Sequence, residues 1–235
     1  MDDWIDFYDS AHTIYVNARH RDLHFLRIAH DLAGHVPAGA TVLDYGCGEA
    51  LHADVVAARA GRLILCEPAP GVRARLAEHW HAAPNIEVCA PDALAALPDH
   101  SIDVVIMHSV AQYLTPEELD AALALFRRLI RAGGLLLVGD VIKPQTPALT
   151  DALALLRFGA REGFFFAAII GLGRTVLSPY WQLRSSLGLT RYDEPAIVAK
   201  LAAAGFSAGR TPANIGHNSA RMTFLARPRG VAAHG

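Results

Sequence analysis

The stretch TVLDYGCGE, residues 41–49, has the pattern of a strand that runs into a glycine turn and then a helix. Thr41–Leu43 is a short β-prone apolar run, Gly46 and Gly48 follow it, and the alanine-rich segment Ala50–Ala60 is typical of a helix. Glycine allows the tight turn, and backbone N–H groups at the start of the helix then point toward a ligand. The stretch therefore predicts a ligand-binding turn at the carboxyl edge of a parallel sheet.

A second apolar run, Leu63–Cys66, ends on Glu67, nineteen residues after Gly48. An acidic side chain about 20 residues past such a turn, at the end of the next strand, suits a ribose diol. A carboxylate accepts hydrogen bonds from both hydroxyls, which gives the spacing a physical reason. A solvated strand end is the alternative role for Glu67, and the glycine turn before it favours ribose binding.

The glycine spacing differs from that of dinucleotide sites. The pattern G-x-G-x-x-G would need a third glycine at position 51, where the chain has Leu51. The sequence D-x-G-x-G at Asp44–Gly48 resembles instead motif I of the class I S-adenosylmethionine (SAM) methyltransferases, whose turn holds the methionine part of SAM. SAM has no pyrophosphate for the backbone to approach, so the third glycine matters less.

Length and composition limit the classes of function. The 235 residues allow one large α/β domain, or one domain with an added cap. Hydrophobic residues make up 52% of the chain, which provides for a sizeable core. The formal net charge of −2 gives no sign of a nucleic-acid binder, so we expect no nucleic-acid partner.

The cysteines and the length of the apolar runs indicate the cellular compartment in which the protein is expected. Cys47, Cys66 and Cys89 lie in or beside expected strands and form no C-x-x-C pair, which favours reduced core thiols in a cytoplasmic protein. The first 30 residues carry acids and histidines, without the apolar stretch of a signal peptide. No apolar run approaches the roughly 18 residues of a membrane span.

The N-terminal segment begins with aromatic residues among acids, and a helix is predicted over Ala18–Gly34. One face of this helix is apolar, and the other carries His20, His24, Arg27 and Asp31. His20 and His24 stand four residues apart and could share a metal ion. No third ligand is evident nearby, so we expect a solvated face and no metal site.

Expected strands and helices alternate along the rest of the chain. The strands are 41–45, 62–67, 86–89, 102–107 and 135–138, then 207–212 and 221–226 after a long break in the rhythm. Strand 102–107 is apolar throughout, which is typical of a parallel sheet covered on both faces. Gly61 and Gly133-Gly134 are interpreted as helix ends, Thr115-Pro116-Glu117-Glu118 as a helix start, and Asp193 as the N-cap of a later helix.

This order of signals resembles a class I methyltransferase from about residue 38 to 228. In that resemblance Glu67 matches the ribose-binding acid, Asp92-Ala93 the residues at the adenine amine, and Ile102–Tyr113 motif IV, beside the methyl group. Arg131–Leu135 matches the loop before strand 5, with alanine where proline is common. The residues expected to bind the cofactor, SAM or its product S-adenosylhomocysteine (SAH), are Asp44, Gly46, Cys47, Gly48, Glu67, Pro68, Asp92, Ala93, His108, Ser109 and Tyr15.

The fold that the resemblance implies is α/β. It is a doubly wound, mostly parallel sheet of seven strands, whose last strand is antiparallel and lies between strands 5 and 6. We expect an N-terminal helical lid over residues 1–36, the SAM-binding domain over 37–228, and a short tail over 229–235. Residues 143–190 interrupt the β–α rhythm and are expected to form a helical cap after strand 5.

The candidate catalytic residues follow from the same topology, because ligands of open α/β sheets bind at the carboxyl ends of the strands. His217, in the loop Asn214–Asn218 between the last two strands, is the histidine that we would choose as a general base, with Tyr113 as a second candidate. His217 in a loop hydrogen bond is the alternative. Tyr8 or Tyr15 could fold over SAM or simply pack.

The sequence thus predicts a methyltransferase that acts on oxygen or nitrogen of a small acceptor. Two other functions stay open, a nucleotide-dependent oxidoreductase on a related fold and a non-catalytic SAM-binding or interaction protein. The cap segment is rich in phenylalanine and isoleucine and has a formal charge of +3. It therefore suits an apolar or amphiphilic acceptor, contact with an anionic membrane, or packing against the main domain or a second subunit as a homodimer.

Overall fold

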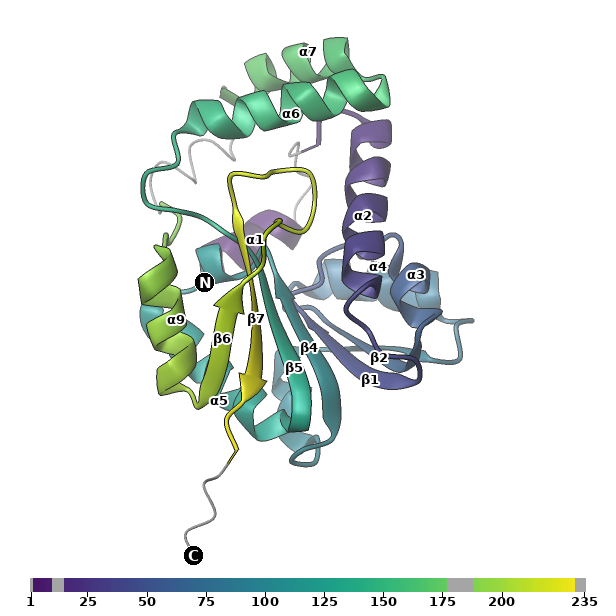
Figure 1. Cartoon of the computed structure of the whole chain (residues 1–235). Coiled ribbons are helices and arrows are strands. Elements are labelled where there is room, and N and C mark those ends of the chain that lie inside the picture. Colours follow the sequence, from purple (N-terminus) through teal and green to yellow (C-terminus); the bar gives the residue numbers. More distant parts are fainter. Residues whose placement is uncertain (1, 10–14, 177–187, 231–235) are drawn as a thin grey trace, which may run out of the picture.

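A computed structural model describes residues 2–9, 15–176 and 188–230 (Figure 1). They fold around one seven-stranded sheet in the order β3-β2-β1-β4-β5-β7-β6. Neighbouring strands among the first five are parallel, and β7 lies antiparallel between β5 and β6. The predicted doubly wound sheet with its inserted antiparallel strand is confirmed.

The two edge strands, β3 and β6, are the shortest, and β5 is the longest. The strands are β1 (Ala40–Tyr45), β2 (Ala60–Cys66), β3 (Ile86–Cys89), β4 (Ile102–His108), β5 (Ile130–Val141), β6 (Phe206–Arg210) and β7 (Met222–Pro228).

Helices separate most of the strands. They are α1 (Asp2–Asp9), α2 (Ala18–Ala33), α3 (Ala53–Ala57), α4 (Pro70–Trp80), α5 (Pro116–Leu129), α6 (Ala148–Glu162), α7 (Phe165–Val176) and α9 (Glu194–Ala203), with short 3₁₀ turns at Pro91–Ala96 and Ala111–Tyr113.

The start of α5 has the predicted cap. Thr115 accepts from the Glu118 backbone N–H, and Glu118 accepts in return from the Thr115 N–H, so two otherwise unsatisfied donors are paired. Asp193 caps α9 as predicted, because its side chain accepts a hydrogen bond from the Ala196 N–H. These caps fix where the two helices begin.

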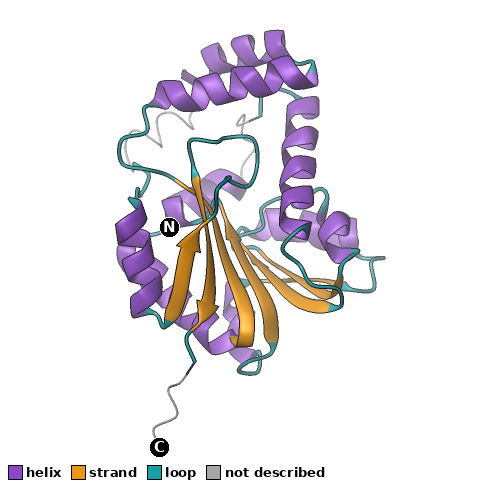
Figure 2. Ribbon diagram, in the orientation of Figure 1, coloured by secondary structure: helices purple, strands orange, loops and turns teal. Residues whose placement is uncertain are grey.

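Helices cover the sheet on both faces (Figure 2). Apolar residues of α5 and α9 form one core with the sheet, and those of α2, α3 and α4 form a second core on its other side. Successive residues of β4 alternate between the cores: Val105 and Met107 belong to the first, Val104 and Ile106 to the second. This double burial explains why the strand is apolar throughout.

The segment after β5 lies beyond the carboxyl ends of the parallel strands, where α6 and α7 run across the top of the molecule in Figure 1. Helix α2 extends from the sheet up to them. The predicted cap is therefore present as two helices, and its residues 177–187 lie outside the described part of the chain. No described helix combines the length and apolar character needed to cross a bilayer.

Two interpretations of glycine as a helix end are wrong. Gly61 lies inside β2, where a Cβ would stand 2.7 Å from the Gly39 carbonyl oxygen. Gly133 and Gly134 lie inside β5, and a Cβ on Gly134 would stand 2.8 Å from the Asp103 carbonyl oxygen. Gly61 and Gly134 thus allow a close approach of two backbone segments.

Candidate active site

The glycine turn after β1 has the backbone geometry that its sequence predicts. Gly46 and Gly48 have φ angles of +71° and +59°, a region that favours glycine. A Cβ on Gly46 would stand 2.6 Å from a methyl carbon of Val110, whereas the space around Gly48 is open. Both glycines line a pocket, and the absence of their side chains leaves the backbone of the turn accessible to a ligand there.

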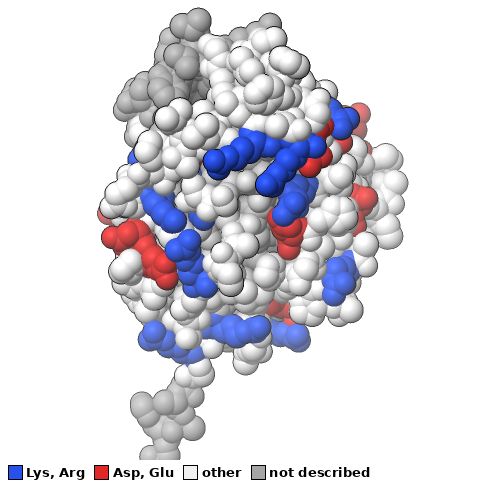
Figure 3. Space-filling view, turned by 45° about the horizontal axis from the view of Figure 1, so that its top comes forward, with Lys and Arg blue, Asp and Glu red and all other residues white. Residues whose placement is uncertain are grey.

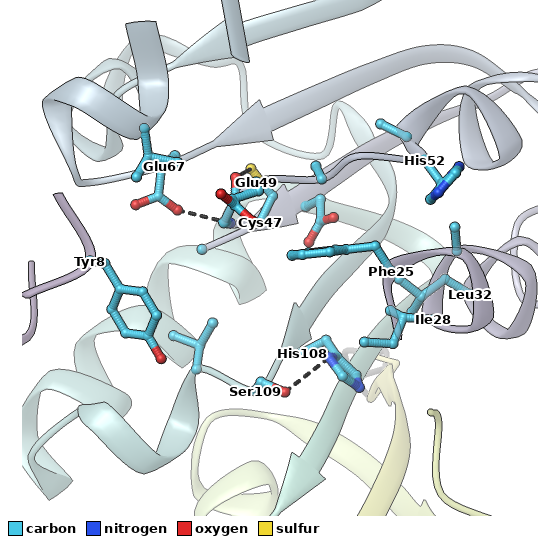
Figure 4. Close-up of a pocket in the computed structure, with 18 of the residues that line it drawn as sticks. Tyr8, Phe25, Ile28, Leu32, Cys47, Glu49, His52, Glu67, His108 and Ser109 are labelled. Carbon is cyan, nitrogen blue, oxygen red and sulfur yellow. Dashed lines mark hydrogen bonds between the residues drawn. The ribbon is translucent and has the colours of Figure 1, made fainter. Parts of the chain in front are cut away.

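Glu67 follows β2 and turns its carboxylate onto this glycine turn (Figure 4). One carboxylate oxygen accepts from the Gly48 N–H at 2.9 Å, and the other accepts from the Ala69 N–H at 2.9 Å. A carboxylate offers about four acceptor positions, so these two bonds leave others for a ligand. Burial raises the pKa of Glu67, and the two backbone donors oppose that rise.

Asp44, the last residue but one of β1, lines the same pocket. Burial raises the pKa of its carboxyl to about 7, and the negative charge of Glu67 adds to the rise. A positively charged ligand beside Asp44 would stabilise its ionised form and reverse this shift. The turn side of the pocket, formed by Asp44, Gly46, Gly48 and Glu67, thus suits a ligand with hydroxyl groups and a positive charge.

The opposite walls of the pocket are apolar and come from the N-terminal helices. In Figure 4, Phe25, Ile28 and Leu32 of α2 lie on one side, and Tyr8 of α1 lies across from them. The Tyr8 hydroxyl lies 2.6 Å from the hydroxyl of Tyr113, which links α1 to the segment after β4. Few polar side chains interrupt this apolar surface.

A polar group stands at the ends of the neighbouring strands β4 and β5. The Ser109 hydroxyl donates to a carboxylate oxygen of Asp140 at 2.9 Å and lies 3.1 Å from Nδ1 of His108. Ser109 and Asp140 have φ angles of +59° and +61°, which cost free energy in residues other than glycine. Strained backbone of this kind is often found at ligand-binding sites.

The interpretation of the polar face of α2 as solvated is wrong for His20 and His24, although Arg27 on the same face is exposed. His20 is 6% exposed, and ring contacts join it to His24 and to His217 of the β6–β7 loop. We call these three residues the histidine cluster. The cap covers it, because Phe158 stacks on His217 with ring centres 4.6 Å apart and Phe164 stacks on His20. Imidazole rings pack here as aromatic surface.

Burial keeps the histidine cluster uncharged. It lowers the pKa of His20 to about 4 and that of His24 well below its usual value, and the mutual proximity of the rings lowers both further. Burial also lowers the pKa of His217, against the opposing charge of Asp140. All three rings are therefore neutral at neutral pH.

One member of this cluster reaches the pocket. His24 is part of the pocket lining, and its Nδ1 is buried without a hydrogen-bond partner among the described residues. His20 and His217 stand behind it, with the His217 ring 5.5 Å from that of His24. His24 thus occupies the position that the sequence had suggested for His217.

Most of the residues expected at the site from the sequence line this one pocket. They are Asp44, Gly46, Cys47, Gly48, Glu67, Pro68, His108, Ser109, Tyr15 and Tyr113. Asp92 and Ala93 are exposed in the 3₁₀ turn after β3 and are not among the lining residues, and neither is His217.

Sequence reasoning missed the lining residues of the N-terminal helices, Trp4, Phe25 and Ile28. The aromatic residues among the first acids were the available signal, because an apolar ring near a chain end needs a surface to cover. His24 was missed since its face looks polar in isolation. No three His, Cys, Asp or Glu side chains of the described residues come together as a metal site.

Comparisons with known proteins agree with this geometry. Residues 43–138 match the family model for a methyltransferase domain. None of the proteins with curated functions matches the chain.

Two solved structures share the fold over nearly the whole chain. One is the N-methyltransferase NodS from Bradyrhizobium japonicum WM9 in complex with SAH, with a TM-score of 0.58 at 16% identity over 97% of each chain. The other is the magnesium protoporphyrin IX methyltransferase ChlM from Synechocystis PCC 6803 with bound SAH. Its TM-score is 0.58 at 20% identity, over 97% of this chain and 93% of that one. Residues 43–138 therefore resemble a methyltransferase domain, and the chain that contains them has the fold of the class I SAM-dependent methyltransferases.

Proposed function

We propose that this protein is a methyltransferase that transfers a methyl group from SAM to oxygen or nitrogen of a small amphiphilic acceptor. The observation that carries the proposal is the arrangement of the pocket, which has a hydrogen-bonding turn on one side and an apolar wall on the other. Two lining histidines, His24 and His108, each keep one buried ring nitrogen without a partner among the described residues. When bound, SAM would supply an electrophilic methyl group, and its sulfur would leave as the neutral thioether of SAH.

The turn side fits this cofactor. Glu67 has acceptor positions left for the two ribose hydroxyls after binding Gly48 and Ala69. The Gly46–Gly48 backbone provides room and N–H groups for the methionine part, and Asp44 provides a negative charge near a cationic ligand. Asp92 and Ala93 remain candidates for the adenine amine through their position after β3.

The apolar wall supports the acceptor class. Phe25, Ile28 and Leu32 of α2 offer an apolar surface, and Ser109 and His24 offer polar atoms beside it. A largely apolar acceptor with one polar group matches this distribution. Methyl transfer from a sulfonium disperses charge, so a dry, well-positioned site supplies much of the rate enhancement.

His24 is the side chain of the histidine cluster that we propose as general base, when the acceptor carries a proton at neutral pH. Its ring is neutral, its Nδ1 has no partner among the described residues, and it lines the pocket. His217 packs behind it and would act by holding the His24 ring in place. Tyr113 remains a second candidate, since it also lines the pocket, where its hydroxyl lies 2.6 Å from that of Tyr8.

The cap acts on this site through its inner face. Phe158 and Phe164 contact the histidine cluster, whereas Phe165 and Ile169 are exposed and are not among the lining residues of the pocket. The described part of the cap therefore shapes the acceptor side indirectly, by covering His20 and His217.

Calorimetric titration with SAM, SAH and NAD tests the cofactor assignment. We expect SAM and SAH to bind and NAD not to bind. Binding of NAD alone would favour a nucleotide-dependent oxidoreductase. SAM binding without SAH formation from any acceptor would favour a non-catalytic SAM-binding protein.

A coupled assay of SAH formation tests the acceptor class, with alkyl-substituted phenols and amines of increasing chain length as probes. Ile28→Ser should raise the KM of the longest probe that reacts and leave SAM affinity unchanged. Ile169→Ser, the same change on the exposed face of α7, is the control and should leave both unchanged in the absence of lipid. A preference for short polar probes would contradict the proposed acceptor.

A further inference from the structure

The exposed apolar surface of the protein is concentrated at one end. The large apolar side chains that are exposed among the described residues all lie on α6 and α7: Leu149, Leu153, Phe165, Phe166, Ile169 and Ile170. Phe166 is 79% exposed and Leu149 is 68% exposed. We call these six side chains the outer cap face.

The outer cap face is additional to the packing that holds the cap on the molecule. The inner side of the two helices already buries Phe158, Phe164 and Ala168 in a core of their own, against Val16 and Leu23. Gly159 lets α7 approach α6 closely, since a Cβ there would stand 3.2 Å from Ala168 and Phe164. A helix that is apolar on two sides has a second surface to cover.

Exposed charges on α6 are mainly basic, since Arg157 and Arg161 are exposed whereas Glu162 is half-buried. Arg157 and Arg161 continue the exposed stripe of α6 that begins with Leu149 and Leu153, and neither forms an ion pair within the described residues. The acidic Asp151 of α6 is turned inward, where it accepts from Arg221 and Asn218. In Figure 3, basic side chains lie in a row below the uncharged surface of the cap.

We propose that the outer cap face docks on an anionic lipid surface, with α6 and α7 lying in the plane of the membrane. Apolar side chains bordered by arginine fit the boundary between acyl chains and anionic headgroups. Helix α6 has 15 residues and therefore lies over about 22 Å of that boundary. A second copy of the chain fits less well, because symmetric pairing would bring the same arginines together.

The consequence for catalysis rests on the proposed function. The pocket is lined by residues of the N-terminal helices and of the segments that follow β1, β2 and β4. The cap lies beyond the same ends of the parallel strands (Figure 1). A docked protein would hold this site close to the membrane surface, where amphiphilic acceptors accumulate. Docking itself requires neither SAM nor turnover, so the two proposals can fail separately.

Co-sedimentation with vesicles tests the docking. The probes are vesicles of phosphatidylcholine alone and vesicles that contain phosphatidylcholine and phosphatidylglycerol in equal parts. The wild-type protein should sediment with the anionic vesicles and release from them as salt is added. Phe166→Ser with Ile170→Ser should weaken this binding at least about tenfold, and so should Leu149→Ser with Leu153→Ser.

Charge reversal separates the electrostatic contribution. Arg157→Glu with Arg161→Glu should weaken binding to anionic vesicles at least about tenfold. The control, Arg227→Glu with Arg229→Glu, makes the same charge change at the opposite end of the sheet and should leave binding unchanged. The thermal midpoint of each variant checks that it folds.

Three results would overturn the proposal. The first is no sedimentation of the wild type with anionic vesicles. The second is equal loss of binding in the Arg227 and Arg229 control. The third is a wild-type dimer in lipid-free solution that Phe166→Ser with Ile170→Ser converts to a monomer, which would assign the outer cap face to self-association.

Discussion

The turn side of the pocket and the histidine cluster are built in different ways. On the turn side, Gly46, Gly48 and Glu67 lie within 22 residues of one another, and backbone N–H groups hold the Glu67 carboxylate. The histidine cluster joins α2 to a loop almost 200 residues later and is covered by the cap. A local motif can be identified from its spacing, whereas a cluster assembled by the fold needs the structure.

The largest expected effect separates His24 from the histidines behind it. His24→Ala should lower turnover roughly 100-fold or more, because it removes the proposed general base, whose side chain lines the pocket. His217→Ala and His20→Ala alter the same cluster but do not change a residue of the pocket lining. Each should lower turnover by less than about tenfold. Turnover at saturating SAM, with SAM affinity measured alongside, is the readout. A greater loss of turnover in His217→Ala than in His24→Ala would assign the role of general base to His217 of the β6–β7 loop.

The next effect concerns the turn side. Glu67→Gln keeps one acceptor oxygen and should weaken SAM binding by about 1.5–3 kcal/mol, the range for a hydrogen bond to a charged group. This change is milder than Glu67→Ala, because the glutamine oxygen can still accept from one of the Gly48 and Ala69 N–H groups, whereas alanine releases both. Calorimetric titration is the measurement.

Glu49 offers a matched control for Glu67. It lines the same pocket, but its carboxylate is held by Arg21 at 2.5 and 2.6 Å, so Glu49→Gln should leave SAM affinity unchanged. Equal affinities for wild type and Glu67→Gln would remove Glu67 from the ribose site and weaken the contrast between the two sides.

The smallest effect is a pH dependence that belongs to the turn side alone. Burial raises the pKa of Asp44 to about 7 in the free protein, so the carboxyl is protonated below that pH. A cationic ligand binds the ionised form better, and binding at lower pH must therefore release a proton. SAM affinity should fall by up to about tenfold per pH unit below about 7 and level off above it.

Asp44→Asn shows whether this carboxyl is responsible. The variant should bind SAM more weakly at high pH and show a flat profile. SAH, which lacks the sulfonium charge, should depend on pH less than SAM does. A profile that persists in Asp44→Asn would point to Glu67, whose pKa burial also raises.

The sheet could be predicted from the sequence because its signals are local. Strand Ile86–Cys89 has the predicted bounds, and the caps at Thr115 and Asp193 form as predicted, since each depends on side chains within three or four residues. Gly61 and Gly134 were misassigned because their reason is a backbone passing from another part of the chain, at Gly39 and Asp103. A glycine alone does not distinguish a helix end from a close approach.

The same limit applies to the site. The turn residues and Glu67 followed from spacing, but the polar appearance of His20 and His24 suggested solvent. The partners that cover them, Phe158 and His217, come from an insertion and a distant loop. Buried aromatic contacts of imidazole have no periodic pattern, so only the folded chain shows them.

The strained ends of β4 and β5 have a consequence for efforts to improve the protein. Ser109 and Asp140 have φ angles near +60°, a region in which glycine has less steric strain than other residues. Their side chains nevertheless form a hydrogen bond to each other beside the pocket. Selection for heat resistance alone would favour glycine at these positions and remove the polar group. Under the proposed function, thermostabilisation and ligand binding would compete at this edge of the sheet, and a useful stabilised variant would need substitutions at other positions.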